Sequence, residues 1–198
     1  MSKNDIFESE FSSNDDEDTK QEKESDEDSP QLQHPNYDLI QTIAITLNMI
    51  LEGNKNLENY NEIISAQSRQ IFSANNIIPR VSIKNYLIRI QTFSNIERST
   101  LIISLIYIDR LCNKTKIMLT HYNIHRILFS SILIAIKYNE DNFYDNKYYS
   151  RISGVKLKEL KALEYNFIKM LDCELYINRE LYNKYEVYLK NFKYNGVY

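Results

Sequence analysis

Apolar residues recur at intervals of three and four from Tyr37 onward, the spacing that places them on one face of an α-helix. We expect the first amphipathic helix to begin near Tyr37 and to end just before Gly53. An Asn-rich loop at 54–61 follows, and a short second helical piece runs through Ile63 and Ile64. The apolar positions of the first helix are Ile40, Ile43, Leu47, Ile50 and Leu51.

Beyond Pro79 the same periodicity predicts five further helical segments and a final short helix that begins after Asn178. Pro79 ends any preceding helix because it has no backbone N–H to donate. No segment alternates apolar and polar residues as a strand does, so the fold is predicted to be all-α. The five segments cover residues 83 to about 93, about 96 to 112, 121 to 138, 146 to 153 and about 156 to 171.

Several helix ends carry capping signals. Ser82 and Thr120 are predicted N-caps, because a hydroxyl can accept a hydrogen bond from a free N–H of the first turn. Ser94 and Glu97 have the spacing of a capping box before the second of the five segments. Gly154 is expected to end the fourth. The segments at 96–112 and 121–138 are apolar on nearly every side, which predicts that they form the centre of the bundle.

Charge divides the chain into two unequal parts. Residues 1–30 contain twelve Asp or Glu and three Lys, a net charge of −9, whereas the remaining residues carry +6. Such a polar segment cannot offset its ordering entropy by burial, so 1–36 is predicted to be an acidic disordered tail. Ser12, Ser25 and Ser29 precede acidic residues or proline as kinase substrates do, although a solubilising tail is the favoured interpretation. The other divisions are an N-terminal helix and linker at 37–78, a helical domain with a C-terminal helix at 79–191, and a short end at 192–198.

The sequence offers little for catalysis, a metal or a cofactor. Its three glycines are far apart, which argues against a phosphate-binding loop. His121 and His125 are four residues apart, but no third ligand is placed near them, and a packed histidine is the favoured interpretation. Ser130 and Ser131 lie in an apolar helix, where each hydroxyl is expected to bond back to the preceding turn. We therefore expect no enzyme active site, cofactor or metal.

Cys112 and Cys173 stand apart in apolar surroundings, so each is predicted to be a buried, reduced thiol of the cytoplasm or nucleus. The chain starts without an apolar secretory segment and has no apolar run long enough for a membrane span.

Nucleic acid is a weaker possibility. Eight of the sixteen tyrosines lie within 138–186, interleaved with Lys and Arg, as in proteins that stack bases. Because Tyr is also a common half-buried residue, packing is the favoured role.

Charged residues inside the two most apolar segments need partners, because an unpaired buried charge is costly. These residues are Asp109, Arg110, Arg126 and Lys137. Arg80 and Arg89 are both candidate partners for Asp109, in a salt bridge that would hold helices together. Lys137 lies at the end of its helix, where a lysine that extends to solvent is the simplest interpretation.

Several ordered motifs resemble the cyclin box. They are SIKNYLIRI at 82–90, LIYIDRL at 105–111 and NIHRIL at 123–128, continued at 135–138, 146–155 and 159–172. The resemblance covers about 38–190 and is to the P-type and U-type (phosphate-system) cyclins. Ser153 stands where such cyclins commonly have a first glycine before Gly154.

The resemblance implies a single five-helix cyclin box with flanking N- and C-terminal helices, and a regulatory subunit that binds and activates a cyclin-dependent protein kinase. It assigns kinase contact to Lys137 and Glu164, and a structural salt bridge to Asp109 and Arg80. The expected partner is the kinase, in a heterodimer. Phosphate signalling, the cell cycle and other processes are all compatible with the resemblance. The alternative is a cyclin-fold adaptor in transcription or nucleic-acid binding, without a kinase.

Overall fold

The computed structural model describes residues 36–67, 71–73 and 77–195, and side chains up to 192. Every regular element in these ranges is a helix, which confirms the all-α prediction for this part of the chain. The predicted acidic tail, apart from Asn36, lies outside the described residues. The helices are α2 (Tyr37–Lys55), α3 (Tyr60–Gln67), α4 (Ile83–Ser94), α5 (Arg98–Thr115), α6 (Ile124–Asn139), α7 (Asn146–Ser153), α8 (Leu157–Met170) and α9 (Arg179–Asn195).

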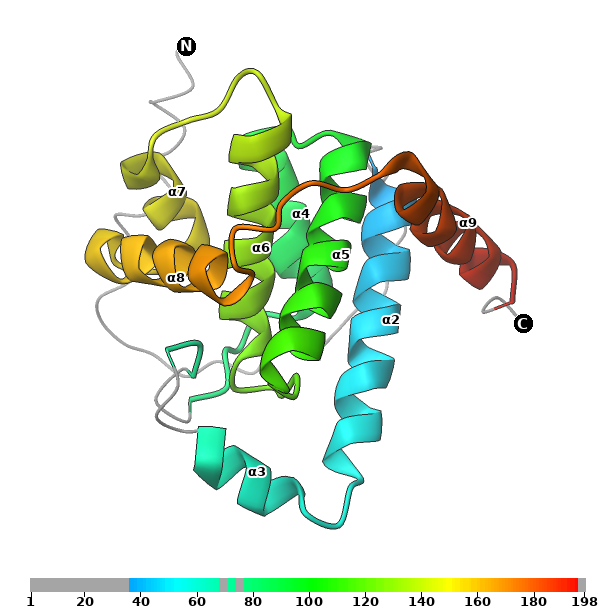
Figure 1. The fold of residues 1–198 in the computed structure, drawn as a ribbon, viewed down its shortest axis with the longest axis vertical. Coiled ribbons are helices and arrows are strands. Elements are labelled where there is room, and N and C mark those ends of the chain that lie inside the picture. The colour runs from blue at the N-terminus through cyan, green and yellow to red at the C-terminus, as the bar shows by residue number, and fades with distance from the viewer. Residues whose placement is uncertain (1–35, 68–70, 74–76, 196–198) are drawn as a thin grey trace, which may run out of the picture. The chain divides into compact units, whose positions relative to one another are not determined.

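Helices α5 and α6 pack side by side at the centre of the bundle, as their nearly continuous apolar surfaces predict (Figure 1). Helix α4 packs against α2 and α7, while α8 packs against α6 and α7. Helix α9 crosses α5 and α2 on the side away from α7 and α8 (Figure 1). Five helices, α4 to α8, therefore form the core unit, and α2, α3 and α9 flank it.

Three predicted helix ends are confirmed by their hydrogen bonds or backbone angles. The Ser82 hydroxyl accepts from the Asn85 N–H at 3.2 Å at the start of α4. The Asn178 side chain accepts from the Leu181 N–H at 2.8 Å before α9. Gly154 ends α7 with a φ of 69°, a conformation that glycine adopts without steric cost.

The two central helices begin later than predicted. Helix α5 starts at Arg98, and no capping box forms: the Glu97 N–H donates instead to Glu140 Oε1, at 3.1 Å, from the end of α6. Helix α6 starts at Ile124, because the Thr120 carbonyl closes a separate turn before it. At α5 a long-range partner thus replaced the expected cap, whereas at α6 a local turn at Thr120 delays the start of the helix.

Two side-chain predictions hold only in part. The Ser130 hydroxyl bonds back to the Arg126 carbonyl, as expected, but the Ser131 hydroxyl donates across to the Ser104 carbonyl of α5. Both cysteines are free thiols, yet the prediction of burial is wrong for Cys173, which is exposed in the turn after α8. Cys112 is half-buried, and burial raises the pKa of its thiol to about 11.

Candidate functional site

Lys137 lies near the end of α6, where α7 and α8 meet that helix. Its Nζ is 2.6 Å from Glu164 Oε1 on α8 and also donates to the side-chain oxygen of Asn146, the first residue of α7. The Asn146 amide nitrogen donates to the other Glu164 oxygen at 2.8 Å. The three side chains therefore form a closed polar triangle, which we call the Lys137–Asn146–Glu164 centre.

The Lys137–Asn146–Glu164 centre is part-buried but reaches the surface. The Lys137 and Glu164 side chains keep 26% and 16% of their exposure. Hydrogen bonds between ionised groups are stronger than neutral ones, so each side chain is held in one position. The structure brings together the two residues that the sequence resemblance paired, and their contact with a kinase stays a prediction.

Exposed aromatic side chains occur in the same segments as this centre. Tyr138 and Tyr165 directly follow Lys137 and Glu164 and are 52% and 65% exposed. Phe143 is also half-exposed, in the loop that precedes α7. These residues give the segments around the polar centre a mixed apolar and charged surface.

A second ion pair joins the same two helices. The Arg126 guanidinium donates from Nε and Nη2 to Glu159 Oε1 at 2.9 and 2.7 Å. Arg126 is part-buried, and Glu159 is the partner within the bundle that its charge requires. Its role is to hold α6 against α8.

Asp109 has a different environment from the one predicted. Its carboxylate is exposed on α5 and accepts a hydrogen bond from the Tyr185 hydroxyl of α9. Arg80 lies exposed before α4, and the ion pairs of the described residues include none between Arg80 and Asp109. Arg89 donates to the Arg151 carbonyl. Asp109 thus faces the C-terminal helix.

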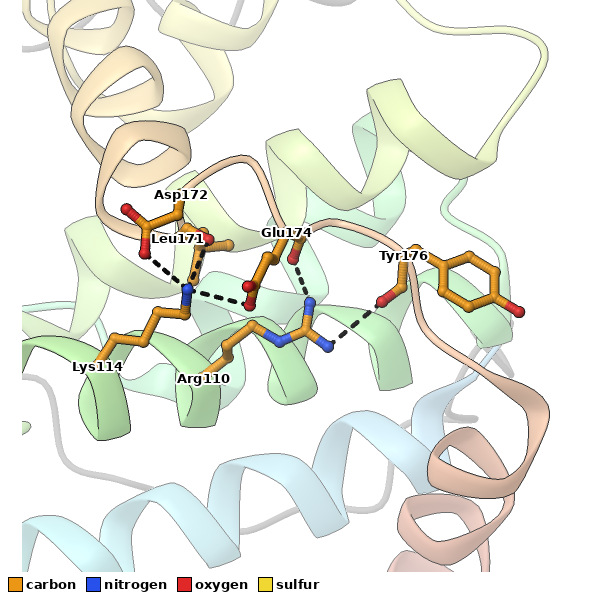
Figure 2. A network of polar contacts seen from close by, with 6 residues as sticks. All are labelled: Arg110, Lys114, Leu171, Asp172, Glu174 and Tyr176. Carbon is orange, nitrogen blue, oxygen red and sulfur yellow. Dashed lines mark hydrogen bonds and ion pairs between the residues drawn. The ribbon is translucent and has the colours of Figure 1, made fainter.

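The neighbours of Asp109 hold the segment that connects α8 to α9. Arg110 donates to the backbone carbonyls of Glu174 and Tyr176 (Figure 2), and the Tyr107 hydroxyl donates to the Leu175 carbonyl at 2.8 Å. The tyrosine and arginine of the LIYIDRL motif therefore satisfy carbonyls that no helix would otherwise pair.

Lys114, one turn further along α5, also binds this segment. We call Tyr107, Arg110 and Lys114 together the polar clasp. Its Nζ donates to the Leu171 carbonyl at 3.2 Å and lies 2.7 and 3.0 Å from the carboxylates of Asp172 and Glu174 (Figure 2). Asp172 and Cys173 have φ angles of 54° and 59°, which cost about 1 kcal/mol or more each for residues with a Cβ. The hydrogen bonds to α5 offset that strain and fix the direction in which the chain leaves α8.

His121 and His125 both have polar partners within the bundle. His121 pairs with Glu52 at 3.2 Å, and His125 Nε2 lies 2.9 Å from the Val81 carbonyl. Burial lowers the pKa of His125, as expected for a packed ring. None of the helices in the described residues is long and apolar enough to cross a membrane.

Sequence reasoning missed Asn146, Tyr185 and Lys114 as contributors. Each has a partner at least 18 residues away in the sequence, and Asn146 has a second one, Lys137, nine residues away. No spacing rule connects these residues. Helix periodicity identifies the buried face of a helix but not which polar side chains meet across it. The aspartate that caps α7, Asp145, was a usable sign that Asn146 begins a helix.

The described residues form a helical bundle whose charged side chains mostly pair with one another or with backbone carbonyls. Comparison with known proteins shows its family. Residues 4–175 match the family profile described as Cyclin. The chain belongs to the cyclin family.

Its relatives include plant and yeast cyclins. Cyclin-U4-1 of Arabidopsis thaliana is 32% identical over 113 residues, covering 57% of this chain and 56% of its own length. Cyclin-U4-3 of the same plant is 27% identical over 160 residues, covering 80% and 72%. PHO85 cyclin-7 of Saccharomyces cerevisiae is 28% identical over 177 residues, covering 80% and 62%. The chain thus spans between about half and three quarters of the length of these relatives.

Proposed function

We propose that this chain is a regulatory subunit that binds and activates a cyclin-dependent protein kinase, with Lys137 and Glu164 in contact with the regulatory helix of the kinase. The unit that binds is the five-helix box with its C-terminal helix, 79–191, supported by 37–78. This role belongs to the cytoplasm or the nucleus.

The observation that carries the proposal is the Lys137–Asn146–Glu164 centre. Three helices of the box meet there, and each contributes one polar side chain to a site that is fixed but still open to solvent. Protein interfaces typically combine a few ordered polar groups with aromatic side chains. The exposed Tyr138, Phe143 and Tyr165 supply the aromatic component.

Such a surface explains activation without any catalytic residue in this chain. A protein kinase transfers phosphate only when a glutamate of its regulatory helix pairs with a lysine of its nucleotide-binding strand. A rigid surface that presses on that helix stabilises the paired state, because binding energy is gained in that state alone. The aromatic side chains provide the contact area, and Lys137 and Glu164 fix the position of the regulatory helix of the kinase along that surface.

The test uses charge reversal at the polar centre. The variants Lys137→Glu and Glu164→Lys each place two like charges together, and the double variant restores an opposite pair with the signs exchanged. One relative is named PHO85 cyclin-7, so the protein that this name calls PHO85 is the first partner to test. We expect each single variant to weaken kinase capture and activation at least about tenfold, a loss of about 1.4 kcal/mol.

The double variant separates binding from folding. If Lys137 and Glu164 act only inside the bundle, restoring their pair restores both stability and kinase capture. If they contact the kinase, the double variant is as stable as the wild type but still fails to capture it. The matched control exchanges Arg126 and Glu159, which join the same helices, and should leave capture unchanged. Full capture by the single Lys137 and Glu164 variants would refute the assigned contact.

A further inference from the structure

A cavity of about 400 Å³ opens between α2, α5 and α9. We call it the α2–α9 groove; α2 and α9, which line it, lie on the side of α5 away from α7 and α8 (Figure 1). Its apolar lining includes Ile43, Leu47 and Ile50 of α2, Leu105 and Ile108 of α5, and Leu189 of α9. Ile50 stays 42% exposed, so the apolar surface continues from the cavity to the outside.

The lining also contains the carboxylate of Asp109, which forms no ion pair with a described residue. Asp109 lines the groove, is exposed, and has no ion pair among those of the described residues. Lys184 also lines the groove, and its Nζ lies 3.1 Å from Glu180 in an exposed pair within α9 rather than beside Asp109. Arg110 is next to Asp109 in sequence, yet its guanidinium donates to backbone carbonyls of the α8–α9 connection. A cation from outside would therefore complement the groove.

Tyr185 keeps this charge at the wall of the groove. Its hydroxyl donates to Asp109, and burial followed by that hydrogen bond raises the pKa of the phenol well above its usual range. The hydrogen bond from the phenol fixes the position of the carboxylate. The neighbouring Tyr188 also lines the groove and is 56% exposed, which extends the apolar surface along α9.

The acidic first part of the chain does not suit this groove. Residues 1–30 carry a charge of −9, the same sign as Asp109. A cavity of this size that opens along three helices accommodates large side chains of a bound segment, as in other helix-lined grooves. We propose that the α2–α9 groove binds a short segment of a partner protein, which inserts large aliphatic side chains and places one Lys or Arg at Asp109.

The test measures fluorescence anisotropy of two labelled peptides against the full chain. Both peptides are short amphipathic leucine-rich helices, and they differ only in a Lys or a Glu at one position beside the apolar stripe. We expect the Lys peptide to bind at least about tenfold more tightly. Asp109→Asn should remove most of this preference, because Asn still accepts from Tyr185 but carries no charge. Asp141→Asn, an exposed loop aspartate, is the matched control and should keep it.

A second variant blocks the cavity directly. Thr46→Trp fills the groove from α2 and should abolish binding of both peptides while the helical circular dichroism signal stays unchanged. The peptide assay contains no kinase, so failure of the kinase proposal would leave this result unaffected. The inference is overturned if neither peptide binds, if both bind equally, if Thr46→Trp binds normally, or if free butylamine competes as well as the Lys peptide.

Discussion

His125 shows how one side chain can make the stability of this bundle depend on pH. Its Nε2 lies 2.9 Å from the Val81 carbonyl, so the neutral ring carries its proton there. Its Nδ1 is buried without a hydrogen-bond partner, and the ring packs edge-on against Tyr86. A second proton on Nδ1 would place a charge where no acceptor lies. Burial, and to a smaller extent His121, therefore lower the pKa of His125.

We expect the free energy of unfolding to fall as the pH drops below about 6.5, the usual histidine pKa. In that range the unfolded chain binds a proton at His125 before the folded chain does, so protonation favours unfolding. Urea denaturation at about pH 7.5 and about pH 5.5 measures the difference. His125→Gln keeps a donor for the Val81 carbonyl and should reduce the difference in the free energy of unfolding between the two pH values. The same pH difference in this variant as in the wild type would show that His125 binds no additional proton when the chain unfolds.

At the residue scale, local patterns predicted which groups need partners but not which partners they have. The sequence indicated correctly that Arg126 requires a partner in an apolar helix, whereas Lys137, interpreted most simply as a lysine that extends to solvent, pairs instead with Glu164. It did not reveal Glu159 or Asn146, because that choice depends on how α6, α7 and α8 are rotated about their axes. The environment of Asp109 differed for the same reason, since it depends on where α9 crosses α5.

At the scale of single elements, the two described glycines differ in what they contribute. Gly154 ends α7 with φ at 69°, and a Cβ there would meet no atom within 4 Å but would be strained by the backbone angle. Gly53 lies inside α2, where a Cβ also has open space and no unusual angle is required. The backbone conformation alone therefore distinguishes the two positions.

We expect Gly154→Ala to destabilise the protein by about 1–2 kcal/mol, the cost of a left-handed residue with a Cβ. Gly53→Ala should stabilise it by about 0.5–1 kcal/mol, since alanine loses less backbone entropy in a helix. Chemical denaturation of both variants measures this contrast. A shift of the same sign in both would contradict the structural distinction.

The elements themselves were largely predictable, because each has a strong apolar face and most have a clear end signal. Ser82, Gly154 and Asn178 act as expected. The start of α5 was misplaced because Glu140 accepts from the Glu97 N–H in place of the expected capping box. The start of α6 was misplaced because the Thr120 carbonyl closes a separate turn before the helix. Helix ends depend on competing partners, whereas helix interiors depend mainly on periodicity.

At the scale of the whole molecule, α9 is attached to the box through α5 and α2. The α8–α9 connection has two consecutive left-handed residues and is held by Tyr107, Arg110 and Lys114. Leu189 inserts from α9 into the bundle, but the helix also borders the open α2–α9 groove. Docking of α9 therefore depends strongly on the polar clasp.

We expect the double variant Arg110→Ala and Lys114→Ala to release this segment without unfolding the box. Amide hydrogen exchange in 171–195 should accelerate about tenfold or more, while α5 and α6 keep their protection. Lys190→Ala, which removes an ion pair within α9 alone, is the control and should have little effect. Uniformly faster exchange would instead show that α9 unfolds only together with the rest.

The closed geometry of the Lys137–Asn146–Glu164 centre affects the kinetics of any encounter at that surface. Lys137 and Glu164 neutralise each other, so the centre projects little net field beyond a few ångströms and contributes little to steering a partner from a distance. The association rate at this site should depend only weakly on ionic strength. Because the side chains are ordered beforehand, less conformational entropy is lost when a partner arrives. The centre therefore favours a long-lived complex over a fast encounter.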